Sequence, residues 1–319
     1  MIQAHALTKR YGDKVAVDDL SFTVQPGMVT GFLGPNGAGK STTMRMIVGL
    51  DAPTTGSVTV NGHPYTDLVR PLNEVGVLLE ARAVHTGRSA RNHLLTMAAT
   101  AGIGRRRVEQ VIDMVGLSDV AGRRVGAFSL GMGQRLGLAS ALLGDPQTLI
   151  LDEPVNGLDP DGVRWIRTLL KGLAEEGRTV FLSSHLMSEM ALTADHVIVV
   201  GRGRLLRDQS MADFIAGESS DSVRVRSPRA RELSALLAAD GVTISSNQDD
   251  TLNVEGLTSE HIGTVAGSAG ITLFELATQS ASLEQAYMAL TEDSLDYRAP
   301  THAERADSNT HSSRERTAA

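Results

Sequence analysis

The chain of 319 residues is long enough for about two domains, and its apolar fraction of 41% is that of a globular protein. A net charge of −7 argues against a protein that neutralises a nucleic-acid backbone, so we expect no nucleic-acid partner and a solvated helix face at Arg105–Arg107. The lack of cysteine excludes disulfides and thiolate metal sites, and no stretch reaches the ~18 apolar residues of a membrane span.

Residues 1–220 alternate short apolar runs with helical patterns, which predicts an α/β domain with a buried, largely parallel sheet. The runs expected to form its strands are 29–34, 148–151, 179–184 and 196–201. Polar and apolar residues alternate in 21–24 and 57–60, which favours an antiparallel sheet with one wet face near the N-terminus. Apolar residues three or four positions apart predict a helical subdomain over about 84–144.

The stretch GPNGAGKST lies between the strand expected at 29–34 and a helix expected at about 40–49, and it matches G-x-x-x-x-G-K-[ST]. Its glycines let the backbone turn N–H groups toward phosphate oxygens at a helix N-terminus, whose dipole favours anions. Lys40 would neutralise the outer phosphates, and Ser41 would offer its hydroxyl to a magnesium ion. The expected nucleotide-binding residues are Gly34, Asn36, Gly37, Ala38, Gly39, Lys40, Ser41 and Thr42. The sequence therefore predicts a nucleoside triphosphate site.

Two acids follow the strand expected at 148–151, in TLILDEP. We expect Asp152 to hold magnesium through its water shell, and Glu153 to orient or deprotonate the water that attacks the γ-phosphate. The two acids can differ in role because successive side chains of a strand diverge. An Asp-Glu-Pro turn that merely follows a strand is the alternative, which the phosphate loop upstream disfavours.

With these two motifs, four further elements in the same chain make this sequence resemble the ATP-binding subunit of an ABC transporter. They are FSLGMGQRL (128–136) for the signature usually written LSGGQ, NGLD (156–159) for the D-loop, SSH (183–185) for the switch histidine, and Tyr11 for the aromatic that stacks on adenine. The resemblance implies a P-loop NTPase fold, with a RecA-like core, an N-terminal antiparallel β subdomain and a helical signature subdomain. It also implies ATP and Mg²⁺ as cofactors and ATP hydrolysis coupled to transport.

By resemblance, two such domains face each other head to tail, and the signature of one contacts the γ-phosphate held by the other. Ser129 would supply a hydroxyl, Gly131 an unobstructed N–H, and the following helix the positive end of its dipole. Asp159 of the D-loop is assigned to the same nucleotide site. A helix N-terminus with no nucleotide role is the alternative interpretation of residues 128–134.

His185 follows a buried strand, and the resemblance assigns it, with Glu153, to catalysis through a contact with the γ-phosphate. A hydrogen-bonded structural histidine would be the interpretation without the other motifs. Tyr11 has a comparable alternative, a packing aromatic at a corner between strand and loop.

Three residues depart from the family pattern. Leu130 and Met132 stand where the family usually has glycine and glutamine, and Glu80 stands where it generally has a glutamine that reaches magnesium. A carboxylate can still ligate magnesium but cannot donate an amide hydrogen bond. Glu80 is therefore a candidate metal ligand, with a strand-end surface residue as the equal alternative.

The resemblance implies a polytopic permease as partner, with the chain in the cytoplasm on the inner face of the cell membrane. A homodimer of ATPase domains is expected, because this chain holds both halves of a competent site. The Glu80 and FSLGM variants and the ending SLEQAYMALT favour the exporters of hydrophobic drugs, antibiotics or lipids. The alternative is an ABC ATPase without a permease, associated with translation or DNA. The single phosphate loop and the absence of heptads disfavour it. A regulatory module without hydrolysis is opposed by Glu153 and His185.

From about residue 221 the pattern reads β-α-β-β-α-β-α, which predicts a small ferredoxin-like α+β domain over 221–293, with its last strand at 271–276. A stabilising appendage, a dimerisation surface and a regulatory ligand site all remain open for it, because fold alone supplies no function. The remaining residues, 294–319, are polar and charged and are expected to be disordered.

Overall fold

The computed structural model describes residues 1–80, 84–218, 222–247, 250–279 and 283–291. The tail expected to be disordered, 294–319, lies outside the described residues. Within the described part, no helix is both long and apolar enough to cross a membrane.

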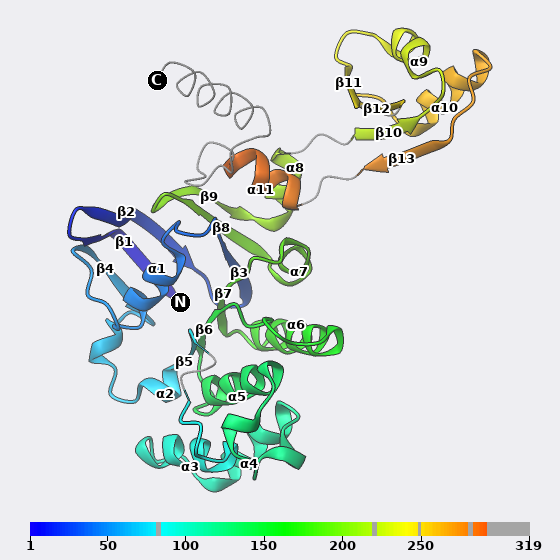
Figure 1. The fold of residues 1–319 in the computed structure, drawn as a ribbon. Coiled ribbons are helices and arrows are strands. Elements are labelled where there is room, and N and C mark those ends of the chain that lie inside the picture. The colour runs from blue at the N-terminus through cyan, green and yellow to red at the C-terminus, as the bar shows by residue number, and fades with distance from the viewer. Residues whose placement is uncertain (81–83, 219–221, 248–249, 280–282, 292–319) are drawn as a thin grey trace, which may run out of the picture.

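A six-stranded sheet forms the centre of the larger unit (Figure 1). Its order is β5 (Val75–Leu78), β6 (Thr148–Asp152), β7 (Thr179–Ser183), β3 (Met28–Leu33), β8 (His196–Gly201) and β9 (Arg204–Ser210). All neighbours are parallel except β8 and β9. Alternate residues of one strand enter different cores, Leu149 and Leu151 on one face and Ile150 on the other. The four expected strands are confirmed, and their continuous apolar character reflects burial on both faces.

An antiparallel sheet of β2 (Lys14–Val24), β1 (Ile2–Tyr11) and β4 (Thr55–Val60) packs near one face of the central sheet, as the alternating pattern predicts. Helix α1 (Lys40–Ile47) contributes to the core between the two sheets. The rings of Phe22, Phe32 and Phe181 meet there, with centroids 5.0 to 5.9 Å apart. These rings pack β2, β3 and β7 together, and β3 is the strand that leads into the phosphate loop.

Helices cover the other face of the central sheet and extend from it (Figure 1). They are α2 (Pro71–Glu74), α3 (Ala90–Thr100), α4 (Arg105–Met114), α5 (Leu130–Leu142), α6 (Pro160–Glu175) and α7 (Met187–Thr193), with 3₁₀ turns at Ser118–Val120 and Val125–Ala127. A further 3₁₀ turn, Tyr65–Asp67, packs instead against the core between the two sheets. Arg107 is not the solvated side chain that the basic run predicted. Its guanidinium donates to the carbonyl oxygen of Leu142 at 2.7 Å and pairs with Asp145 at 3.1 Å. Arg107 thus satisfies carbonyl groups that the end of α5 leaves unpaired.

A second sheet is formed by residues beyond α8 (Met211–Glu218), in the order β11 (Thr243–Asn247), β12 (Thr251–Glu255), β10 (Ser222–Arg226) and β13 (Glu275–Gln279). All neighbours are antiparallel, and α9 (Ala230–Leu237) and α10 (Ser259–Ser268) pack in its core. This order is that of a ferredoxin-like unit. The last strand begins at Glu275 and not at residue 271, and Ile271 and Leu273 pack into the core ahead of it.

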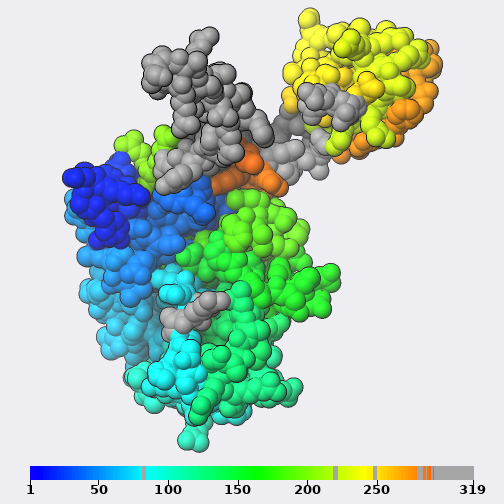
Figure 2. All heavy atoms as spheres, viewed as in Figure 1, coloured from blue at the N-terminus to red at the C-terminus, as the bar shows by residue number. Residues whose placement is uncertain are grey.

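Helix α11 (Leu283–Thr291) contacts α8 and α7 of the larger unit. Its buried residues Leu283, Ala286 and Tyr287 belong to the same core as Phe214 of α8. Figure 2 shows α11 in orange against the larger unit, whereas residues 222–279 form a separate lobe. Helix α11, which the sequence pattern groups with the small domain, therefore packs on the larger unit.

Candidate functional site

The phosphate loop, residues 34–39, leaves β3 and enters α1 beside a pocket of about 310 Å³. Tyr11, Lys14 and Ala16 line one part of this pocket, and residues 35–42 line the rest. Gly39 caps α1 with φ 98°, and a Cβ atom there would lie 2.5 Å from the carbonyl oxygen of Ala16. Only glycine fits this backbone, so the loop keeps its N–H groups at the start of the helix, where anions bind.

Lys40 is one of the two lysines that line the pocket. Its Nζ donates to the carbonyl oxygens of Gly34 at 2.6 Å and Pro35 at 3.2 Å, which holds the side chain across the loop. Burial lowers the pKa of Lys40, and the nearby carboxylates of Glu153 and Asp152 act in the opposite direction. The ammonium group therefore lies between the loop carbonyls and the two acids predicted to serve the same nucleotide.

Ser41 and Asp152 meet at the carboxyl edge of the central sheet. The Ser41 hydroxyl donates to Asp152 Oδ2 at 2.9 Å, so these two predicted metal ligands are brought together. Ser183, opposite Asp152 in the register of β6 and β7, donates its hydroxyl to Asp152 Oδ1 and accepts the N–H of Glu153 at 3.1 Å. Ser183 was not among the predicted site residues, and its position at the end of β7, two residues before His185, was the available signal.

Glu153 and His185, the two predicted catalytic residues, are in direct contact. His185 Nδ1 lies 2.7 Å from Glu153 Oε2, and the His185 N–H donates to the same oxygen at 3.2 Å. The backbone of Glu153 has φ 52°, an uncommon conformation for a residue with a side chain. It is held by Ser183 and by the buried Gln134, which donates Nε2 to the Glu153 carbonyl at 3.0 Å. Gln134 was not among the predicted site residues.

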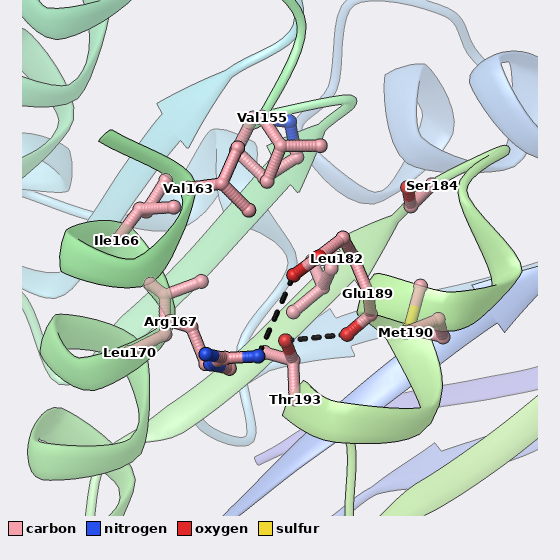
Figure 3. A pocket seen from close by; sticks show the side chains of 11 residues that line it. Val155, Val163, Ile166, Arg167, Leu170, Leu182, Ser184, Glu189, Met190 and Thr193 are labelled. Carbon is pink, nitrogen blue, oxygen red and sulfur yellow. Dashed lines mark hydrogen bonds and ion pairs between the residues drawn. The ribbon is translucent and has the colours of Figure 1, made fainter. Parts of the chain in front are cut away.

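Helix α7, which follows His185, is joined to α6 by an ion pair (Figure 3). Arg167 of α6 pairs with Glu189 of α7 at 3.6 Å, and Thr193 donates to the Glu189 carbonyl at 2.7 Å. The hollow beside them, lined mainly by apolar side chains, holds about 10 Å³. That volume suits one water molecule at most. This region therefore supports the site and is not a second ligand pocket.

Tyr11 lines the phosphate pocket, with 47% of the residue exposed. Its hydroxyl donates to Asp51 at 3.0 Å, and the Lys9 ammonium lies 5.0 Å from its ring centroid. Desolvation, followed by the Asp51 carboxylate, raises the pKa of the phenol. The hydrogen bond to Asp51 thus orients the Tyr11 ring, which remains exposed at the phosphate pocket.

Glu80 leaves the sheet after β5, which lies beside β6, and therefore follows the same edge as Asp152. The side chain is exposed. Among the described residues, no hydrogen bond or ion pair joins Glu80 to Ser41 or Asp152. The structure leaves Glu80 outside the contacts that gather the other predicted metal ligands.

The signature turn, residues 128–134, lies at the start of α5. The Ser129 hydroxyl accepts the N–H of Met132 at 3.2 Å and so caps this helix. Asp159 caps α6 in the same way, through the N–H of Gly162 at 3.0 Å. Ser129 lines a second pocket of about 330 Å³, and neither it nor Gly131 or Asp159 lines the phosphate pocket. One chain thus gathers the phosphate loop, the two acids and His185, but not the signature and D-loop residues.

Comparison with known proteins agrees with this geometry. Residues 17–156 match the ABC transporter family, and residues 221–284 match a domain of unknown function. The chain is 43% identical over 211 residues to the bacitracin transport ATP-binding protein BcrA of Bacillus licheniformis, covering 65% of this chain and 69% of the relative. It is 37% identical over 249 residues to the Nod factor export ATP-binding protein I of Rhizobium meliloti, covering 73% and 74%.

A solved ATP-binding subunit of an ABC transporter superposes with a TM-score of 0.63 and 25% identity, over 68% of this chain and 92% of that structure. The family match includes the phosphate loop and both acids. The chain therefore belongs to the ATP-binding proteins of ABC transporters, and it is an ATP-binding P-loop NTPase with ATPase activity.

Proposed function

We propose that this protein is the ATP-hydrolysing subunit that powers a separate membrane permease, for export of hydrophobic drugs, antibiotics or lipids. One observation carries the catalytic part: Lys40, the Ser41–Asp152 pair and the Glu153–His185 pair converge beside the phosphate pocket. The relatives named for bacitracin transport and Nod factor export support the transport part.

In the proposed mechanism, the phosphates of ATP lie on the N–H groups of the phosphate loop, and Lys40 exchanges its carbonyl partners for phosphate oxygens. Glu153 orients the attacking water and accepts its proton. His185 contacts the Glu153 carboxylate through Nδ1, and we assign its Nε2 to the γ-phosphate, an arrangement in which both ring nitrogens donate and which therefore uses the imidazolium form. The loop N–H groups and Lys40 then stabilise the negative charge that develops on the phosphate oxygens in the transition state. Such positioning and electrostatic stabilisation supply most of the catalysis in phosphoryl transfer.

The oxygen donors of this site fit magnesium. Ser41 and Asp152 offer a hydroxyl and a carboxylate that already meet at 2.9 Å. Among the described residues, no group of three or more acidic, histidine or cysteine side chains could hold a metal alone, which suits an ion that keeps waters and substrate phosphates as ligands. Magnesium would shield the negative charge of the phosphates, and Ser183 would orient the Asp152 carboxylate toward it.

Ser129, Gly131 and Asp159 do not line the phosphate pocket of their own chain, so we propose that they serve a nucleotide held by a second copy. Two copies facing head to tail would then bury two ATP molecules between them. We further propose that the pair binds a polytopic permease on the inner face of the cell membrane, which the relatives named for bacitracin transport and Nod factor export support.

The substitution Glu153→Gln tests the catalytic assignment. It removes the proton acceptor but keeps the size of the side chain, so we expect ATP turnover to be abolished while ATP-bound dimers accumulate in size-exclusion chromatography. Glu109→Gln is the control, because Glu109 is an exposed residue of α4 that pairs with Arg91. Unchanged hydrolysis in Glu153→Gln would remove Glu153 from the mechanism.

Purification from native membranes tests the permease. A polytopic membrane protein should co-purify with the chain and should raise or regulate its ATPase rate. The alternative function, an ABC ATPase associated with translation or DNA, predicts recovery of ribosomes or DNA with no membrane protein. That outcome would overturn the transport proposal and leave the ATPase assignment intact.

A further inference from the structure

The signature turn contacts the D-loop turn, residues 156–159, within the same chain. The side chain of Leu130 lies directly over Gly157, and a Cβ atom at residue 157 would overlap Leu130 Cγ and Cδ2. Gly157 also has φ 75°, a conformation that favours glycine. The contact is therefore specific: a bulky residue on one turn lies against a residue without a side chain on the other.

A second contact lies beside the first. A Cβ atom at Gly131 would lie 2.7 Å from the carbonyl oxygen of Gly157 and 3.7 Å from Leu158 Cδ2. The two backbones approach so closely that Gly131 has no room for a side chain. Moving the D-loop turn therefore moves the surroundings of the Gly131 N–H, which the proposed function assigns to the γ-phosphate.

The contact continues between the helices that follow the two turns. Arg135 of α5 places its guanidinium 4.9 Å from the ring centroid of Trp165 on α6, within cation–π range. The Arg135 Nη1 donates to the carbonyl oxygen of Val115 at 2.9 Å, which orients the guanidinium group. Leu130, Gly131 and Arg135 thus join α5 to the D-loop turn and α6 over more than one helical turn.

Leu130 stands where the resemblance to the family leads us to expect glycine, and it is 47% exposed. Because about half of Leu130 is exposed to water, its burial contributes little to stability. What a glycine at this position could not supply is the side-chain contact with Gly157. We propose that Leu130 is a positioning residue that holds the D-loop turn against the signature turn, so that Gly131 and Asp159 reach the nucleotide of the facing chain together. This proposal rests on the proposed function.

The expected consequence is a change in KM and not in kcat. Without the Leu130 side chain, the D-loop turn samples more conformations before ATP binds, and binding must then supply the cost of ordering it. Glu153 and His185 are untouched, so the chemical step keeps its rate. We expect KM for ATP to rise about 3- to 10-fold and kcat to stay within about twofold.

The experiment compares Leu130→Ala with Leu130→Met, which restores the bulk over Gly157. Leu236→Ala is the matched control, because Leu236 is also a half-exposed leucine but lies on α9 of the small unit. Steady-state ATPase measurements give KM and kcat. The chain has one tryptophan, Trp165, so acrylamide quenching of its fluorescence in nucleotide-free protein reports the contact between α5 and α6.

We expect Leu130→Ala to raise KM and to increase Trp165 quenching, and Leu130→Met to return both toward the parent values. Parent-like KM and quenching in Leu130→Ala would overturn the proposal. The quenching assay needs no hydrolysis, so it tests the contact even if the parent protein proves inactive as an ATPase. Failure of the proposed function and failure of the Leu130 assignment are therefore distinguishable.

A double substitution gives an independent readout. Gly157→Ala alone should lower the ATPase rate, because the new methyl group overlaps Leu130 and its backbone is strained. Adding Leu130→Ala should restore part of that loss, since it removes the atoms that the methyl group meets. Losses that simply add would show that the two residues act independently, and would overturn the proposal.

Discussion

The two parts of the nucleotide site use their polar side chains differently. In the phosphate-loop part, Ser41 contacts Asp152 and Glu153 contacts His185, and each pair joins two different elements. In the signature part, the Ser129 hydroxyl and the Asp159 carboxylate each cap the helix that they begin. The polar side chains of the first part bond to other site residues. Those of the second part bond to the first turn of their own helix and so stabilise that helix.

This difference predicts how substitutions will separate activity from stability. Changes in the phosphate-loop part should lower the rate with little effect on folding, because the affected side chains are held by each other and not by a helix end. Changes in the signature part should lower both, because a helix loses its cap. Three matched pairs of substitutions test this expectation.

Ser183→Ala should have the largest effect of the three. It removes the hydroxyl that contacts both Asp152 and the Glu153 N–H, so we expect kcat to fall about 10- to 100-fold and the magnesium requirement to rise. Ser184→Ala is the control, since its hydroxyl accepts the N–H of Leu186 at 3.0 Å and not a group of the acidic pair. Equal losses in both variants would show that Ser183 does not orient the acids.

Ser129→Ala should affect stability and activity together. Ser129 and Ser89 cap their helices with the same geometry, each accepting an N–H three residues ahead at 3.2 Å. Alanine at either position should cost about 1 kcal/mol of unfolding free energy in denaturant titration. Only Ser129→Ala should also reduce ATP-driven dimerisation. If Ser89→Ala reduced dimerisation equally, the loss would reflect helix capping and not contact with nucleotide.

Tyr11→Ala should have the smallest effect, a loss of about 2- to 10-fold in ATP affinity, because ring stacking contributes about 0.5–1.5 kcal/mol. Tyr11→Phe keeps the ring and removes only the hydrogen bond to Asp51. Titration with a fluorescent ATP analogue should therefore leave Tyr11→Phe close to the parent. Equal weakening in the two variants would assign the role to the hydroxyl and not to stacking.

The sequence predicted the parts of the site that depend on local order along the chain. A strand, a glycine-rich loop and a helix follow one another in the phosphate loop, and acids end β6, so short windows were enough. Parallel strands then bring their carboxyl ends to one edge, which accounts for the meeting of Asp152 with Ser183. The fold of the larger unit could be predicted for the same reason.

Contacts between distant segments could not be predicted in this way. Gln134 reaches the Glu153 carbonyl only because α5 packs on β5, the strand beside β6, and Arg107 reaches Leu142 only because α4 packs on α5. The contact of Leu130 with Gly157 likewise depends on where two turns meet. Within its own short stretch of sequence, Gln134 is an ordinary polar residue, Arg107 an ordinary basic residue, and Leu130 only a departure from the family pattern.

The packing of α11 on α8 distinguishes two ways of shortening the protein. Cutting the chain after α8 would remove Leu283, Ala286 and Tyr287 from the core of the larger unit, and would leave Phe214 facing solvent on that side. Excising residues 222–279 and rejoining the ends would keep that core closed. Loss of activity in a simple C-terminal truncation would therefore report a damaged ATPase body, and only the internal excision isolates what the small lobe contributes.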